Sequence, residues 1–353
     1  MTLLPYLRLD EHSVANDGGG HSPSYGLGAA IEVEAVPADP RPRRLTPKVF
    51  LLLSTYDGAA FLPSQLESLM AQTHDHWVLY WRDDGSSDDT VAILEEFAAL
   101  MGGERCVRVL GPPGRLGPAE SFITLLHAVA PFLGPADGIA FADQDDVWLP
   151  DKLSRGIDAL AAVDHEVPSL YCARLMVVDS RLQRLTETSI FAQRCGFPAS
   201  LTQNVASGCT ILLNRSAVAL VAASMPPPAS PHDWWCYLLI SAAGGRILVD
   251  DMVVALYRQH RNNVFGARSS RVKRAAAAMR RGPGPFMNVL RQHVAALAAQ
   301  PDLVSEAMRP AVWQLQSSLQ GNFWRRLHIL RLQGLHRQTR LETLLFRLWF
   351  LIG

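Results

Sequence analysis

Apolar positions change their spacing along the first half of the chain in a way that predicts alternating strands and helices. Val49–Leu53 and Gly138–Ala142 are short apolar runs, which favour strands buried on both faces. Helical spacing of apolar residues begins at Leu62 and continues through Met70. Further strands are expected at Trp77–Trp81 and Cys106–Leu110, and further helices at Asp88–Leu100 and Ser121–Phe132. This alternation predicts βαβ units around a mostly parallel sheet.

The rest of the chain divides at changes in composition. Residues 1–46, rich in glycine and proline, are expected to be a flexible leader, and residues 47–267 a globular α/β domain. Strands are expected at Leu170–Val178 and Arg246–Tyr257, with a helix near Trp234–Ala242. Residues 268–353 are expected to form a basic, helical extension that ends in an apolar helix, Leu341–Ile352.

Composition and charge narrow the class of protein. Apolar residues make up 48% of the 353 residues, which excludes wholesale disorder. The net charge is zero, but residues 261–353 contain 15 Lys/Arg against 3 Asp/Glu. An acidic body with a basic tail suggests a site that uses a cation and an anionic surface as partner, rather than nucleic acid.

Targeting signals and the spacing of cysteines indicate the cellular compartment of the protein. Apolar runs are too short for a transmembrane helix, and the N-terminus lacks the pattern of a signal peptide. The five cysteines include no CxxC pair, which argues against a zinc site or a disulfide scaffold. We therefore expect a cytoplasmic protein.

Acidic residues follow three of the predicted strands. Asp57 follows the first strand, Asp83 and Asp84 the second, and the segment 143–146 (Asp-Gln-Asp-Asp) the fourth. Because the carboxyl ends of parallel strands share one edge of a sheet, these carboxylates are expected to lie together at a ligand site.

Each acidic cluster also has a purely structural interpretation. Asp88 and Asp89 fit the start of a helix, where acids are favoured, but Asp83 and Asp84 precede the turn and are better placed to accept hydrogen bonds from a nucleoside. The segment 143–146 is either an exposed acidic turn or a site for Mg²⁺ or Mn²⁺, which would relieve the repulsion between its carboxylates.

Two further motifs each allow a structural and a functional interpretation. Asp233 precedes two tryptophans, so it is either the first residue of a core helix or a general base with a raised pKa. Arg258 and His260 suit either a surface turn or the binding of a diphosphate.

Taken in order, these motifs resemble family 2 glycosyltransferases of the GT-A fold, with the rhamnosyltransferase-like branch the nearest in character. The resemblance covers about residues 48–267 and rests on Asp57, RDDGSSDDT (82–90), FADQDDVW (141–148), NVASGCTILLN (204–214), HDWW (232–235) and YRQHRNNVFGA (257–267). It implies a Rossmann-like, mostly parallel sheet flanked by helices, with a helical C-terminal extension.

The resemblance also implies roles for single residues. Thr55, Asp57, Asp83 and Asp84 would bind the nucleotide. Asp143 and Asp145 would fill the two acidic positions of the DxD signature, Asp145 as principal metal ligand, and Asp233 would be the general base. His260 would lie at the metal and diphosphate, with Arg258 on the diphosphate. Gly208, Cys209 and Thr210, together with His232 and Trp234, would line the acceptor side. Residues 111–122 lack the asparagine often found before Leu-Gly, and Arg115 is expected to contact phosphate or sugar instead.

The implied activity is inverting transfer of a sugar, with dTDP-L-rhamnose as the expected donor and a glycan or lipid-linked acceptor. The enzyme would need Mg²⁺ or Mn²⁺. The basic residues 268–281 and the terminal helix, which carries Trp349 and two phenylalanines, favour peripheral association with the inner face of the cell membrane, and the alternative is that Leu341–Ile352 packs on the catalytic domain as ordinary core. Two other functions stay open: a metal-dependent nucleotidyl or phosphoryl transferase, for which no GxxxxGK[ST] cradle is found, and a non-catalytic glycan-binding module.

Overall fold

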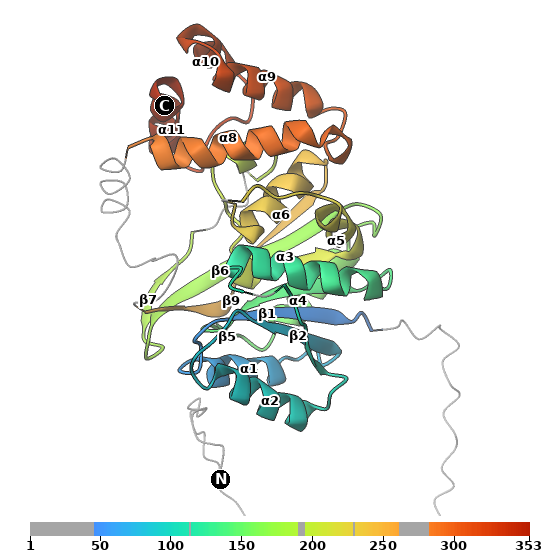
Figure 1. Cartoon of the computed structure of the whole chain (residues 1–353). Helices are drawn as coiled ribbons and strands as arrows, with labels where there is room; N and C mark the ends of the chain where they lie inside the picture. The colour runs from blue at the N-terminus through green and yellow to red at the C-terminus, as the bar shows by residue number, and fades with distance from the viewer. Residues whose placement is uncertain (1–45, 113, 190–194, 229, 261–281) are drawn as a thin grey trace, which may run out of the picture. The chain divides into compact units, whose positions relative to one another are not determined.

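A mixed β-sheet forms the centre of the protein in this computed structural model (Figure 1). The structure describes residues 46–112, 114–189, 195–228, 230–260 and 282–353. Four neighbouring strands are parallel: β3 (Cys106–Arg108), β2 (Trp77–Asp83), β1 (Val49–Thr55) and β4 (Gly138–Asp143). The sheet continues through β8 (Leu212–Asn214), β6 (Ser169–Asp179), β9 (Arg246–Gln259) and β5 (Val147–Trp148), and β7 (Arg184–Glu187) pairs with β6. The predicted parallel order is confirmed up to β4. Beyond it the sheet is mixed, because β8 runs antiparallel to both of its neighbours and β5 is antiparallel to β9.

Helices cover both faces of this sheet because successive side chains of a strand point to opposite faces. The face that carries Val49, Leu51 and Leu53 packs on α1 (Leu62–Met70), α2 (Thr90–Met101) and α4 (Lys152–Ala161). The face that carries Phe50 and Leu52 packs on α3 (Pro118–Val129), α5 (Arg215–Ala222) and α6 (His232–Ala242). The ends of the predicted elements differ by a few residues. The predicted helix Ser121–Phe132 is α3 followed by the 3₁₀ turn η1 (Ala130–Phe132).

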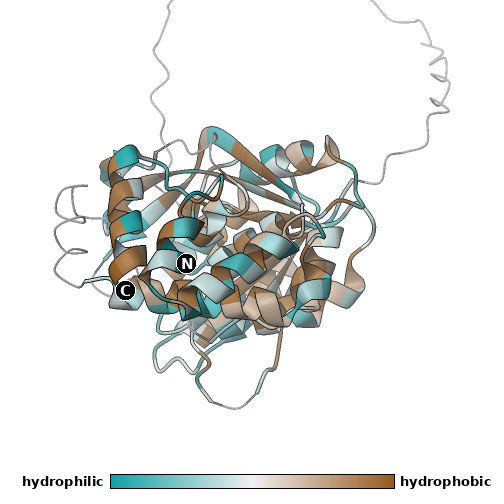
Figure 2. Ribbon diagram, turned by 90° about the horizontal axis from the view of Figure 1, so that it is seen from above, coloured by the Kyte–Doolittle hydropathy of each residue, from teal (hydrophilic) through white to brown (hydrophobic). Residues whose placement is uncertain are grey.

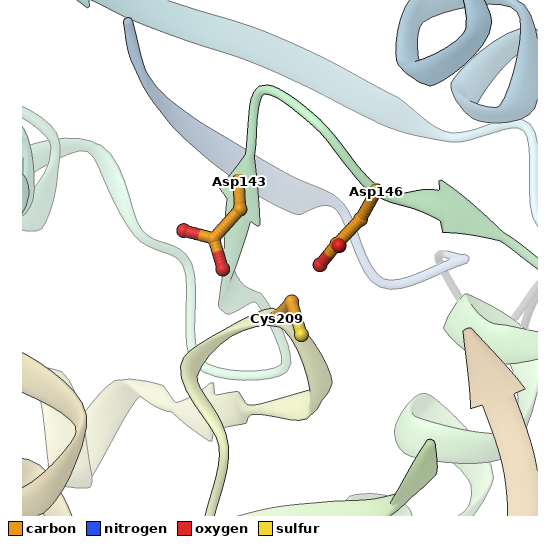
Figure 3. A group of neighbouring side chains, drawn as sticks. All are labelled: Asp143, Asp146 and Cys209. Carbon is orange, nitrogen blue, oxygen red and sulfur yellow. The ribbon is translucent and has the colours of Figure 1, made fainter. Parts of the chain in front are cut away.

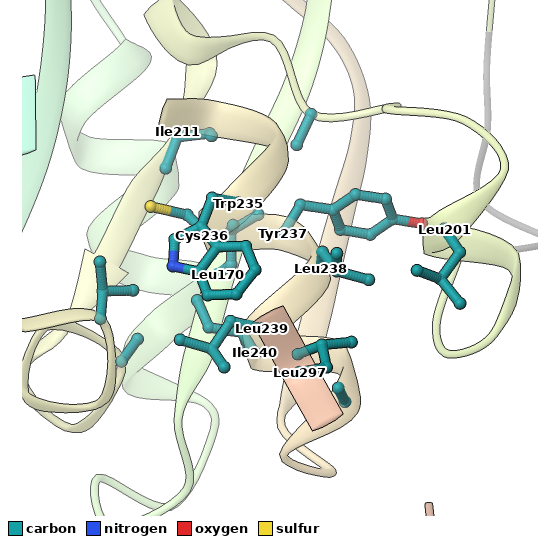
Figure 4. Packing of buried hydrophobic residues seen from close by; sticks show 14 of the residues in the cluster. Leu170, Leu201, Ile211, Trp235, Cys236, Tyr237, Leu238, Leu239, Ile240 and Leu297 are labelled. Carbon is teal, nitrogen blue, oxygen red and sulfur yellow. The ribbon is translucent and has the colours of Figure 1, made fainter. Parts of the chain in front are cut away.

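Four helices at the C-terminal end belong to the same hydrophobic core. They are α8 (Gly284–Ala299), α9 (Arg309–Gln320), α10 (Phe323–Ile329) and α11 (Arg340–Ile352), with the 3₁₀ turn η4 (Pro301–Leu303) after α8. Leu297 of α8 packs with the buried side chains of α6 (Figure 4). Phe346 and Phe350 of α11 are fully buried in that cluster. The described part of residues 45–353 is therefore one compact unit.

Parts of the predicted organisation fall on residues that the structure does not describe. The leader, residues 1–46, lies outside the described residues except for its last residue, and the whole of the basic stretch 268–281 lies outside them as well. Within the described ranges, every helix is too short or too polar to cross a lipid bilayer.

Candidate active site

The loops that follow β1 and β2 are held together by two of the predicted acids. Asp83 accepts hydrogen bonds from the Thr55 hydroxyl (3.0 Å) and from the backbone N–H of Ser86 (2.8 Å). Asp57 has a positive φ of 45° and accepts from the backbone N–H of Ser87 at 2.7 Å. Thr55, Asp57 and Asp83 thus lie together at the sheet edge, as expected, and each of them fixes the position of the turn.

Asp84 is nearly buried and connects β2 to the loop before α3. Its carboxylate pairs with Arg82 at 2.7 Å and accepts the backbone N–H groups of Leu116 (2.8 Å) and Gly117 (2.7 Å). Burial acts to raise the pKa of Asp84, but Arg82 and the two N–H groups stabilise the ionised form and hold the pKa below its usual range. The sequence suggested a nucleoside contact for Asp84, and in the structure Asp84 anchors this loop.

A pocket of about 560 Å³ opens between these loops. Its walls combine strand ends with the loop before α3, and the lining residues are Tyr56, Arg82, Asp83, Asp84, Gly85, Arg108, Val109, Leu110, Gly111, Pro112, Gly114 and Arg115. The guanidinium of Arg115 lies 3.6 Å from the centre of the Tyr56 ring. The pocket therefore has an aromatic wall, three arginines and two carboxylates, a mixture that suits a charged, partly aromatic ligand.

Gln144 links this pocket to the second acidic cluster. Its side-chain oxygen accepts the backbone N–H of Tyr56 (2.8 Å), and its side-chain nitrogen donates to the Tyr56 carbonyl (2.9 Å). A Cβ on Gly58 would come within 2.2 Å of the same side chain, so a larger residue there would displace Gln144. Sequence reasoning missed Gln144, because its role depends on contacts between segments 88 residues apart.

The acids after β4 are crowded and only partly compensated. Burial, together with the charges of Asp145 and Asp233, raises the pKa of Asp143 to about 7. Asp146 is fully buried, and burial and its acidic neighbours raise its pKa as well. Asp143 and Asp146 point from the two ends of this loop toward Cys209 (Figure 3). Ligand atoms of these three residues lie within 4.8 Å of one another.

This cluster suits a hard divalent cation. Among the residues that the structure describes, Oδ2 of Asp146 has no hydrogen-bond partner, and a cation would relieve the repulsion that raises both pKa values. Mg²⁺ and Mn²⁺ prefer carboxylate oxygen, so the buried thiol of Cys209 is a poor ligand for them. Asp146 was not among the predicted ligands, and its burial is the property that the sequence did not reveal.

The other predicted metal residues lie beside this cluster. Nε2 of His260 is 2.7 Å from a carboxylate oxygen of Asp145, and its ring stacks on Phe61 with 4.6 Å between ring centres. The buried guanidinium of Arg258 donates to the carbonyl oxygens of Asp145 (2.8 Å) and Ser180 (3.0 Å). Arg258 therefore holds the acidic loop in place, in addition to giving it a positive neighbour.

Asp233 lies in the first turn of α6 and belongs to the same site. One carboxylate oxygen accepts the backbone N–H of Trp234 (2.6 Å), and the other accepts that of Gly208 (3.1 Å). Burial raises the pKa of Asp233 to about 6, against the opposing effect of these hydrogen bonds. Its charge also contributes to the raised pKa of Asp143. Asp143, Asp145 and Asp233 therefore lie close together, whereas Asp84 lines the pocket beside β2.

The residues expected on the acceptor side pack around this helix start. Gly208, Cys209 and Thr210 form the 3₁₀ turn η3, and a Cβ on Gly208 would lie 3.0 Å from Nε2 of His232. The His232 ring lies against Phe122 with 4.2 Å between ring centres, and burial lowers its pKa to about 3. The indole N–H of Trp234 donates to the carbonyl of Ser200, in the turn η2 (Ala199–Leu201), at 2.8 Å.

Comparison with known proteins agrees with this geometry. Residues 51–220 match the family described as Glycosyl transferase family 2. These residues form a family 2 glycosyltransferase domain. The chain is also similar in fold to TarS of S. aureus, solved in complex with UDP-GlcNAc, with a TM-score of 0.53 and 15% identity over 80% of this chain and 78% of that one. The fold is therefore that of the GT-A glycosyltransferases, as the sequence predicted.

Curated relatives share shorter stretches with this chain. The dTDP-rhamnosyl transferase RfbG of Shigella flexneri is 33% identical over 31% of this chain and 36% of its own length. The UDP-Glc:alpha-D-GlcNAc-diphosphoundecaprenol beta-1,3-glucosyltransferase WfgD of Escherichia coli is 28% identical over 32% of this chain and 40% of its own length. The chain thus spans about two fifths of the length of these relatives.

Proposed function

We propose that this chain transfers a sugar from a nucleoside-diphosphate sugar to an acceptor hydroxyl, with inversion at the anomeric carbon. We assign the chemistry to residues 47–267 and treat 268–353 as a helical extension. The observation that carries the proposal is the position of Asp233, a half-buried carboxylate with a pKa of about 6, next to the charge cluster around Asp143. A base next to a cation site suits a displacement in which the base takes the proton of the acceptor hydroxyl and the cation stabilises the departing diphosphate.

Asp233 would act as the general base. Its carboxylate accepts the proton of the acceptor hydroxyl while the hydroxyl oxygen forms a bond to the anomeric carbon. The bond from that carbon to the diphosphate oxygen breaks, and its electron pair leaves on the diphosphate. A positioned base accelerates such a step by about 10²–10⁴-fold. Since the pKa of Asp233 is about 6, the side chain is mostly ionised and ready to accept a proton at neutral pH.

The residues after β4 would hold Mg²⁺ or Mn²⁺. We propose Asp143 and Asp145 as ligands, and His260 beside Asp145 as a further ligand or a contact to the diphosphate. When bound, such an ion supplies positive charge to the departing diphosphate. Asp146, close to Asp143, adds negative charge that favours binding of the ion, and the hydrogen bonds of Arg258 hold the loop in place.

The donor nucleoside would occupy the 560 Å³ pocket, where Tyr56 offers an aromatic surface and Arg115 a cation for phosphate or sugar. Asp57, Asp83 and Asp84 would set the shape of this pocket and offer acceptors to the base and ribose. We propose dTDP-L-rhamnose as donor, supported by the similarity to RfbG, and a glycan or lipid-linked acceptor, supported by the similarity to WfgD.

A panel of nucleotide sugars tests this proposal. Thermal unfolding of the full chain would be followed with each donor in the presence of Mn²⁺ and again in EDTA, and released nucleoside diphosphate would be measured. We expect one donor to raise Tm only with metal, and to be slowly hydrolysed even without acceptor. Donor binding with no release of nucleoside diphosphate would indicate a non-catalytic glycan-binding module, and release of pyrophosphate would indicate a nucleotidyl transferase.

A further inference from the structure

The outward side of α11 is a continuous apolar stripe. Leu341, Leu344, Leu348 and Ile352 are 74%, 62%, 51% and 63% exposed. Their spacing of three and four residues places them along one side of the helix. The opposite side carries the buried aromatic residues Phe346, Trp349 and Phe350. The helix is thus apolar on two sides. The aromatic side lies in the core, so this side of the terminal helix packs on the catalytic domain and only the leucine side is exposed.

Helix α10, which contacts α11, also exposes large apolar side chains. Phe323 is 49% exposed and Trp324 is 72% exposed, although both are large aromatic residues. We call the four residues of the stripe together with Phe323 and Trp324 the apolar edge. Figure 2 shows the hydrophobic colour along the helix that ends at the C-terminus. Exposed apolar groups gathered in this way mark a binding surface rather than ordinary surface variation.

The charges around the apolar edge identify its partner. Residues 323–353 contain six arginines and a single acid, Glu342. Arg340 and Arg347 are seven residues apart, so they lie on the same side of α11, next to the stripe. Arg325 and Arg331 are exposed nearby. A second copy of this chain would bring the same arginines against one another, whereas an anionic lipid surface would pair with them.

We propose that the apolar edge docks on an anionic lipid bilayer, with α11 lying in the plane of the interface. The leucine stripe would enter the boundary of the acyl chains, Trp324 would lie at headgroup level, and the arginines would meet lipid phosphates. This arrangement agrees with helices that are too short to span a bilayer in the described residues. The proposal depends on neither the donor nor the acceptor, so it stands or falls separately from the proposed activity.

Co-sedimentation with vesicles tests the proposal. The full chain would be mixed with phosphatidylcholine vesicles, with and without phosphatidylglycerol, at low and high salt. The double variant Leu344→Glu/Leu348→Glu places charge in the stripe, and Leu100→Glu is the matched control, since Leu100 is 68% exposed on α2. We expect binding only to the anionic vesicles, weakened by salt, and at least about tenfold weaker in the double variant but unchanged in the control.

Three outcomes would overturn this assignment. One is that the wild-type chain stays in solution with anionic vesicles, and another is that the double variant binds them as the wild type does. The third is a dimer, measured by light scattering, that the double variant converts to monomer, because a second copy would then cover the edge. Thermal unfolding would check that each variant is folded. The variant Arg340→Gln/Arg347→Gln leaves the leucine stripe intact and should reduce the preference for vesicles that contain phosphatidylglycerol.

Discussion

The carboxylates after β2 and those after β4 lie at the same sheet edge but in opposite electrostatic conditions. Asp84 is paired with Arg82 and accepts two backbone N–H groups, so its pKa is lowered. Asp143 faces other acids, and its pKa is raised to about 7. The first group of acids therefore holds loops around a pocket, whereas the second holds negative charge that is not fully compensated. The opposite pKa shifts distinguish carboxylates that shape the site from carboxylates that favour binding of a cation or a proton.

The largest effect is expected for Asp233→Asn. The amide keeps the size of the side chain but cannot accept the proton of the acceptor, so transfer should fall by about 10²–10⁴-fold while donor KM changes little. Steady-state kinetics with donor and acceptor would measure both quantities. The control is Asp89→Asn, an exposed acid at the start of α2. Wild-type rates in Asp233→Asn would remove this residue as the base.

Asp145→Ala should affect the cation instead of the base. Loss of this carboxylate would weaken metal-dependent donor binding, and we expect turnover to fall by about 10²–10³-fold, the usual loss when charge stabilisation is removed from a transition state. Titration of Mn²⁺ followed by calorimetry, with donor present, would report the metal affinity directly. If Asp145→Ala binds Mn²⁺ as the wild type does, while Asp146→Ala does not, the ligand is Asp146.

Stability provides a direct test of the comparison between the two acidic groups. Asp84→Asn leaves Arg82 buried without its countercharge and should lower stability by about 3–5 kcal/mol. Asp143→Asn removes a repelled charge and should raise Tm when metal is removed by EDTA. The sign follows from linkage: a carboxyl whose pKa is raised on folding destabilises the folded state as pH rises from about 4 toward 7. If both variants changed Tm equally at pH 8, the charges of Asp84 and Asp143 would not have opposite effects on stability.

How much of this site the sequence could predict depends on the range of the contacts involved. Strand and helix periodicity was enough to place Asp57, Asp83 and Asp143 at one edge, because parallel strands impose that geometry. Periodicity also predicted the terminal helix, but not which side enters the core, since α11 is apolar on both sides. Gln144 and Asp146 were missed as functional residues because burial and partners 88 and 112 residues away define them.

The pH profile should separate the base from the residues that bind the cation. Because the pKa of Asp233 is raised to about 6, its protonated fraction grows below that pH, and kcat should fall about tenfold for each further pH unit. Kinetics at saturating donor and Mn²⁺, between pH 5 and about 8, would measure this limb. In Asp233→Asn the limb should be absent from the residual rate. A limb that persists unchanged in the variant would assign it to another group.

A smaller effect is expected at His293, through which α8 supports the start of α6. His293 is fully buried, its Nε2 is 2.7 Å from the Ser230 hydroxyl, and its ring meets Trp234 edge-on at 5.0 Å. Burial lowers its pKa to about 4, so it acts as a neutral hydrogen-bonding group. His293→Leu would free the segment before Asp233, and we expect kcat to fall about tenfold, with donor KM unchanged, because small displacements of a base are costly.

The matched variant His293→Gln distinguishes positioning from packing. A glutamine nitrogen or oxygen can occupy the place of Nε2 and keep the bond to Ser230, so most of the lost kcat should return. Because Asp233 itself is unchanged, the pH midpoint of kcat should shift in His293→Leu only if the loosened helix start admits water, which would move the pKa of Asp233 back toward its ordinary value. Equal kcat and equal pH midpoints in wild type and His293→Leu would show that the C-terminal helices contribute stability but do not position the base.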